Sequence, residues 1–184
     1  MRQIPNILSA LRIVMVGVFI WLFTKGRYLS ALAVYVLAFL TDILDGQLAR
    51  RHGWITDVGK LLDPLADKMM VIAALVCIYL GKRSPVYLVL FILVGMKELL
   101  MLVGGIFMVR RKVVAFSDWF GKIPTGLFAV GIFLSMLSFV FKQIEPYNLY
   151  VLIAATVSSY VALIHYGCVQ LPRAFGREQR VEKA

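Results

Sequence analysis

Six long apolar segments, separated by short polar breaks, make up most of this chain of 184 residues. Each has about 17 to 25 residues, the length that an α-helix needs to cross about 30 Å of hydrocarbon. The breaks hold glycine, proline and cationic residues, which commonly end helices. The segments are Ile7–Phe23, Tyr28–Arg50, Gly59–Leu80, Pro85–Val109, Phe120–Phe141 and Asn148–Val169. The pattern predicts an all-α integral membrane protein with six transmembrane helices.

Composition supports this class. The chain is 61% apolar with a mean hydropathy of +0.84, whereas about 45–50% is usual for soluble domains. We find no polar domain and no low-complexity linker. Residues 1–184 are therefore expected to form a single membrane domain.

The formal charge of +10 is best explained by cationic loops that hold the helices against an anionic leaflet. No basic patch is interleaved with exposed aromatic residues, so we expect no nucleic-acid partner. With six spans, twelve Lys and Arg residues fall on the side of the N-terminus and five on the other. This bias predicts a multi-pass protein of the cell (cytoplasmic) membrane with both termini cytoplasmic.

Acidic residues gather where the second and third segments meet. Five of the ten lie within Asp42–Asp67, and a carboxylate at the centre of a membrane helix costs roughly 2.5–3.5 kcal/mol. Facing lipid, four would cost on the order of 10 kcal/mol. We therefore expect them to line a polar cleft on the cytoplasmic side. The pattern is Asp42-x2-Asp45-Gly46-x2-Ala49-Arg50-x8-Gly59-x3-Asp63-x3-Asp67.

This spacing suits a metal site. Residues three or four apart share one face of a helix, so each pair of aspartates projects from one face. Four carboxylates from two antiparallel helices suit hard cations such as Mg²⁺ or Mn²⁺, and two such ions could clamp a phosphoryl group. The small residues Gly46, Ala49 and Gly59 allow a phosphate to approach closely, and Arg50 is placed to meet a second phosphate.

The complete motif resembles that of the CDP-alcohol phosphotransferases, also called class I CDP-alcohol phosphatidyltransferases. The resemblance implies transfer of a substituted phosphoryl group from a CDP-linked lipid to an alcohol, with release of CMP. It also implies a homodimer. It makes Asp42, Asp45, Asp63 and Asp67 metal ligands, with Asp67 also the catalytic base. It assigns contacts with the CDP group to Gly46, Ala49, Arg50 and Gly59.

Three other stretches resemble bacterial phosphatidylglycerophosphate and cardiolipin synthases of this family. They are Ile4-Pro5-Asn6-Ile7-Leu8-Ser9-x2-Arg12, Leu62-Asp63-Pro64-Leu65-Ala66-Asp67-Lys68, and the later loop Trp119-Phe120-Gly121-Lys122-x2-Thr125. The chain departs from these synthases at Lys97, where they usually have Arg, and at Pro124, where many have a second basic residue. The resemblance implies CDP-diacylglycerol as donor and glycerol 3-phosphate as acceptor. An alternative acceptor is phosphatidylglycerol, which would give cardiolipin, or another alcohol. An alternative from a different class of protein is a cation transporter.

Glycerol 3-phosphate is a dianion and needs fixed cations. The predicted loop after the fourth segment offers Arg110, Arg111, Lys112 and Lys122 on the side of the aspartates, and we take Arg110, Arg111 and Lys122 as candidate acceptor contacts. These cations would equally serve as membrane anchors.

Other polar and aromatic residues have structural interpretations. Glu98 is expected either to pair with Lys68 or Lys97 or to contact substrate. Six aromatic residues near segment ends are predicted to lie at the membrane interfaces, namely Trp21, Tyr28, Tyr79, Tyr87, Trp119 and Tyr147.

Overall fold

A computed structural model of the chain describes residues 4–52, 57–110, 119–165 and 167–168. Side chains are described for 10–41, 68–101, 103–104, 123–165 and 167–168. Within these ranges the regular structure is helical, with no strand. The elements are α1 (Ile4–Thr24), α2 (Tyr28–His52), α3 (Asp57–Lys82), α4 (Pro85–Arg110), α5 (Trp119–Leu137), the short 3-10 helix η1 (Lys142–Ile144) and α6 (Glu145–His165).

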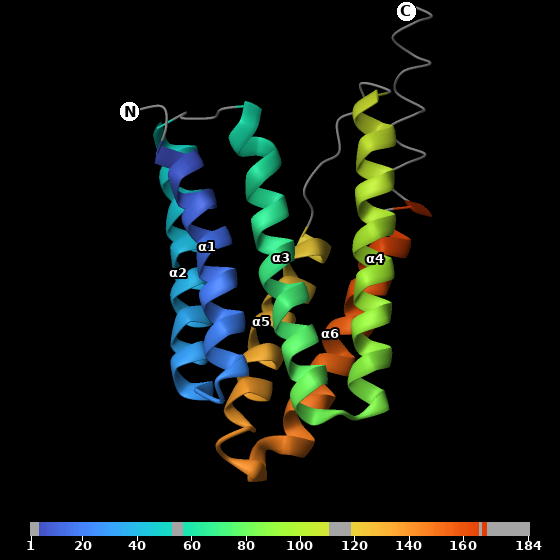
Figure 1. Ribbon diagram of the computed structural model, residues 1–184. Helices are drawn as coiled ribbons and strands as arrows, with labels where there is room; N and C mark the ends of the chain where they lie inside the picture. Colours follow the sequence, from blue (N-terminus) through green and yellow to red (C-terminus); the bar gives the residue numbers. More distant parts are fainter. Residues whose placement is uncertain (1–3, 53–56, 111–118, 166, 169–184) are drawn as a thin grey trace, which may run out of the picture.

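The helices run up and down in alternation (Figure 1). Helix α1 packs against α2 and α3, α5 packs against α6, and α3 and α4 contact each other. Further contacts join α2 to α5, α3 to α5 and α4 to α6. The start of α1, the end of α2, the start of α3 and the end of α4 all lie at the upper end of the view (Figure 1). The connections α1–α2, α3–α4 and α5–α6 lie at the lower end.

The first four predicted segments agree with α1 to α4, with ends that differ by at most three residues. The last two predicted segments coincide with α5 and α6 but differ in their boundaries. Helix α5 ends at Leu137 instead of Phe141, because the chain tightens there into i→i−3 hydrogen bonds, such as Val140 N–H to Leu137 O at 3.0 Å. Helix α6 begins at Glu145 instead of Asn148 and ends at His165. The predicted end, Val169, lies outside the described residues.

The core contains apolar side chains from all six α-helices. Phe19 of α1, Ile78 of α3, Ile132 and Met136 of α5, and Leu152 of α6 are completely buried. The α5–α6 contact is close at Gly131, where a Cβ atom would lie 2.8 Å from Leu152 Cδ2. Glycine at this position therefore lets the two backbones approach each other.

At the lower end, an aromatic cluster joins the three connections. The Phe139 ring stacks on Tyr28 at 4.7 Å between centroids and meets Phe23 edge-on at 5.2 Å. The Lys82 ammonium lies 4.8 Å from the centre of the same ring and forms a 2.7 Å ion pair with Glu145. These contacts fasten the end of α3 to the start of α6.

A buried polar network corrects the expectation for Tyr87. Asn148, which is completely buried, donates from Nδ2 to the Tyr87 hydroxyl at 3.0 Å and to Ser135 Oγ at 3.1 Å. Tyr87 is therefore an interior residue that links α4 to α5 and α6, and not an interfacial one. Trp21 and Tyr147 are exposed, as residues of an interfacial belt would be.

By length and apolar composition, one helical stretch of the described residues qualifies as a membrane span, Lys142–His165. Shorter apolar helical stretches cover Ala10–Thr24, Tyr28–Thr41 and Ile123–Leu137. The six helices are thus confirmed, and their number as membrane spans stays a prediction.

Candidate active site

The aspartate motif lies on two antiparallel helices at one end of the bundle. Asp42 and Asp45 belong to the second half of α2, and Asp63 and Asp67 to the first half of α3. Gly46, Ala49 and Arg50 follow on α2, and Gly59 lies in the first turn of α3. Both helical halves lie at the upper end of the view (Figure 1). The side chains of all eight residues lie outside those described.

The structure describes the backbone of two of the candidate acceptor cations. Arg110 is the last residue of α4, and Lys122 belongs to the first turn of α5. Their side chains are outside the described set, and Arg111 and Lys112 lie outside the described residues altogether. The stretch from Trp119 to Thr125, which resembles a later loop of the bacterial synthases, is the beginning of α5, within one residue of the predicted start at Phe120.

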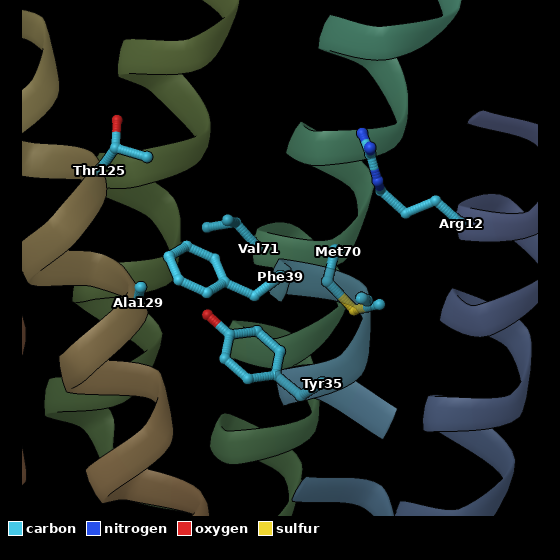
Figure 2. Close-up of a pocket in the computed structure, with 8 residues that line it drawn as sticks. Arg12, Tyr35, Phe39, Met70, Val71, Thr125 and Ala129 are labelled. Carbon is cyan, nitrogen blue, oxygen red and sulfur yellow. The ribbon is translucent and has the colours of Figure 1, made fainter. Parts of the chain in front are cut away.

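A cavity of about 30 Å³ lies between four helices next to the motif (Figure 2). Figure 2 shows its wall, with side chains reaching it from each of these helices. Helix α1 contributes Arg12, α2 contributes Tyr35, Ala38 and Phe39, α3 contributes Met70 and Val71, and α5 contributes Thr125 and Ala129.

Helical spacing connects this cavity to the aspartates. Ala38 precedes Asp42 by four residues, and Val71 follows Asp67 by four. Because residues four apart share one face of a helix, the cavity continues the two motif faces toward the middle of the bundle. Extending the motif by one helical turn in both directions along the sequence predicts Ala38 and Val71 as neighbours of the site. The contribution of α5 could not be predicted in this way, because it depends on the fold.

Arg12 supplies a buried cation at this cavity. Its side chain is 3% exposed, and its guanidinium is directed toward α3 (Figure 2). A guanidinium removed from water is costly unless it is hydrogen-bonded or faces an anion. Arg12 and Thr125 come from two of the stretches that resemble the bacterial synthases, and both line this cavity.

Glu98 is held by two lysines. Lys68 Nζ lies 2.9 Å from Glu98 Oε2, and Lys97 Nζ lies 2.7 Å from Glu98 Oε1. We call these three residues the Glu98 triad. The expected internal ion pair is therefore confirmed, and it involves both lysines, one on each carboxylate oxygen.

Comparison with known proteins shows the family. A profile of the CDP-alcohol phosphatidyltransferases matches residues 2–164. The chain belongs to this family and is therefore a CDP-alcohol phosphatidyltransferase, an enzyme. The eight motif residues and the Arg12 cavity all lie within the matched region.

Several curated relatives carry more particular names. A "CDP-diacylglycerol--glycerol-3-phosphate 3-phosphatidyltransferase" of Aquifex aeolicus is 33% identical over 136 residues, which are 71% of this chain and 76% of that protein. A "Probable phosphatidylglycerophosphate synthase" of Mycobacterium tuberculosis is 38% identical over 141 residues, or 73% of this chain and 66% of the relative. A "Cardiolipin synthase (CMP-forming)" of Streptomyces coelicolor is 38% identical over 107 residues, or 55% of this chain and 50% of the relative.

Proposed function

We propose that this chain transfers the phosphatidyl group of CDP-diacylglycerol to glycerol 3-phosphate, with release of CMP. The observation that carries the proposal is the complete aspartate motif, which lies on the antiparallel helices α2 and α3 at one end of the helix bundle. The chain also matches the family profile over residues 2–164. The relatives from Aquifex aeolicus and Mycobacterium tuberculosis have names that correspond to this reaction.

The lipid donor requires a membrane enzyme, and the surface supports one. Large apolar side chains are exposed on every helix, for example Leu11 on α1, Leu40 on α2, Leu80 on α3, Leu99 on α4, Val130 on α5 and Val157 on α6. Such a surface is unusual for a protein in water and is expected for one in lipid. We propose six membrane spans with both termini on the cytoplasmic side.

Mg²⁺ or Mn²⁺ fits the motif. The donor set consists of carboxylates alone, which hard divalent cations prefer. Asp42 and Asp45 are three residues apart on α2, and Asp63 and Asp67 are four apart on α3, so each pair shares a face. These four residues would hold the metal, which when bound neutralises phosphate charge and makes the acceptor hydroxyl more acidic.

The chain's own residues then bind, orient and move a proton. Arg50, with the small residues Gly46, Ala49 and Gly59, holds the CDP group. The acceptor oxygen forms a bond to the phosphorus of the phosphatidyl group. The pyrophosphate bond to CMP breaks, and its electron pair leaves with CMP. Asp67 accepts the proton of the acceptor hydroxyl.

The second candidate function keeps the chemistry and changes the acceptor to phosphatidylglycerol. The Streptomyces coelicolor relative favours it, because its name is that of a cardiolipin synthase. The two acceptors differ in charge and solubility. Glycerol 3-phosphate is a soluble dianion, whereas phosphatidylglycerol is a lipid with a single negative charge.

A competition assay separates the two. Purified protein in vesicles with CDP-diacylglycerol and Mn²⁺ is offered glycerol 3-phosphate, phosphatidylglycerol or both, and lipid products are resolved by mass. We expect phosphatidylglycerophosphate to be the main product in the mixture. Cardiolipin as the main product would replace the first proposal with the second.

A further inference from the structure

We propose that the Glu98 triad is a positioning device that sets the rotation of α3, and thereby the direction of Asp63 and Asp67, against α4. This inference rests on the proposed metal site. It concerns three residues that the proposed chemistry does not use. Glu98 is a positioning residue here and not a catalytic one.

The first step is the geometry of the carboxylate. Each oxygen of Glu98 has its own ammonium group, Lys97 on Oε1 at 2.7 Å and Lys68 on Oε2 at 2.9 Å. A carboxylate held at both oxygens cannot rotate without breaking a charge-assisted contact. Since Lys97 and Glu98 both belong to α4, the carboxylate is fixed to that helix, and Lys68 of α3 is attached to it.

The second step is the place of Lys68 on α3. Lys68 directly follows Asp67, so the two side chains leave the helix about 100° apart. The Lys68 contact therefore determines which way the Asp67 side of α3 faces. Val71, one turn after Asp67, lies on the cavity shared with α2. With Lys68 drawn to α4, we infer that the face of Asp63 and Asp67 lies on the side of α3 that borders this cavity, which residues of α2 also line.

The third step is charge. The triad combines two ammonium groups with one carboxylate, and it is partly withdrawn from solvent, with side-chain exposures of 26% for Lys68, 13% for Lys97 and 18% for Glu98. Lys68 and Lys97 form no ion pair with any other described side chain. Replacing Glu98 with a neutral residue would leave two ammonium groups close together. Their repulsion would push α3 away from α4 and turn the aspartates.

The chain offers a matched control at the other end of α3. Lys82 forms a 2.7 Å ion pair with Glu145 of α6 and also lies over the Phe139 ring. Glu145→Gln removes the same charge from a contact of the same length, but it leaves only one ammonium group, which keeps its aromatic contact. This pair lies at the opposite end of α3 from the motif, with Lys82 fifteen residues after Asp67.

The test measures Mn²⁺ binding to the full-length protein by electron paramagnetic resonance, without substrate. We expect Glu98→Gln to weaken Mn²⁺ binding about 10-fold, as changes in groups that orient metal ligands do. In the CMP-release assay it should lower kcat and leave the KM for both substrates almost unchanged. Glu145→Gln should bind Mn²⁺ like the unaltered protein.

A charge exchange provides the second variant. Lys68→Glu combined with Glu98→Lys again places two ammonium groups around one carboxylate between the same helices. We expect this double variant to recover Mn²⁺ affinity to within a few-fold of the unaltered protein, even if Glu98→Gln fails to fold.

Three results would overturn the inference. They are unchanged Mn²⁺ affinity in Glu98→Gln, weak Mn²⁺ binding in a well-folded charge-exchanged variant, and a raised KM for the acceptor alone, which would make the triad an acceptor contact. The Mn²⁺ measurement is independent of turnover. Protein that binds Mn²⁺ but ignores glycerol 3-phosphate would count against the proposed acceptor and not against the triad.

Discussion

Acidic side chains in apolar helices are costly, and this chain uses them in two ways. Glu98 is paired with two lysines inside the bundle. The four motif aspartates follow a spacing that favours shared ligation of metal instead. The metal-ligand prediction rests on the i,i+3 and i,i+4 spacing of the aspartates within each helix. The ion pair of Glu98 was predicted from the presence of Lys68 and Lys97 in neighbouring apolar segments. Which lysine binds Glu98 could not be predicted, since that depends on how α3 is rotated against α4.

Substitution of single motif aspartates tests the metal site. Asp42→Asn, Asp45→Asn and Asp63→Asn should each abolish CMP release, because an amide cannot replace an anionic oxygen ligand. Asp57→Asn, at the start of α3 but outside the motif, should keep most of the activity. All four proteins should reach the membrane in similar amounts. Near-normal turnover of any one of the first three would remove that residue from the site.

Removal of the candidate acceptor cations tests the acceptor contacts. Arg110→Ala or Lys122→Ala should raise the KM for glycerol 3-phosphate and change that for CDP-diacylglycerol much less, and Arg111→Ala should do the same. Loss of one charge-assisted phosphate contact costs roughly 1.5–3 kcal/mol, on the order of 10- to 150-fold in kcat/KM. Lys142→Ala, at the opposite end of the bundle, serves as control. An equal loss for both substrates would indicate an anchoring role.

At the scale of elements, apolar length predicted where helices exist better than where they end. Glu145 and Pro146 lie in the predicted break between the fifth and sixth segments, whereas the structure has them in the first turn of α6, where proline favours helix initiation. The end of α5 depends on Phe139, whose ring is held by Phe23 and Tyr28 from the α1–α2 region. The interior position of Tyr87 is likewise absent from the local sequence, because its partner Asn148 lies 61 residues away. Contacts at such distance in sequence leave no local pattern.

Two glycines of α5 allow a matched test of the α5–α6 contact. A Cβ at Gly131 would lie 2.8 Å from Leu152 Cδ2, whereas nothing lies within 4 Å of one at Gly126. Gly131→Ala should destabilise the fold by about 1–3 kcal/mol through overpacking. Gly126→Ala should be neutral or stabilising by roughly 0.5–1 kcal/mol, since alanine favours a helix. Unfolding in detergent monitored by circular dichroism measures both, and equal stability of the two variants would contradict the close contact.

At the scale of the whole molecule, the up-and-down order of the helices brings distant sequence to one end. The ends of α2 and α4 and the starts of α1 and α3 lie at the same end of the bundle (Figure 1). This grouping agrees with the sequence prediction that the motif and the Arg110 region share one side. The lateral order of the helices was not predictable, because a uniformly apolar helix does not indicate which neighbour it will contact.

Labelling of an introduced cysteine tests the orientation. His52, the last residue of α2, is expected on the cytoplasmic side from the bias of twelve cationic residues against five. An impermeant thiol reagent should therefore fail to label His52→Cys in intact cells and should label it after permeabilisation. Cys77 and Cys168 are replaced by serine in both the variant and its control. Labelling in intact cells would invert the orientation.

The central claim is transfer of a phosphatidyl group to glycerol 3-phosphate at the aspartate motif. The most direct measurement follows radiolabelled glycerol 3-phosphate into lipid while CMP is counted in the same reaction. We predict one CMP for each labelled lipid formed, a strict requirement for CDP-diacylglycerol, loss of both products with EDTA, and recovery with Mg²⁺ or Mn²⁺. CMP release without label in lipid, or label in lipid without CDP-diacylglycerol, would contradict the account.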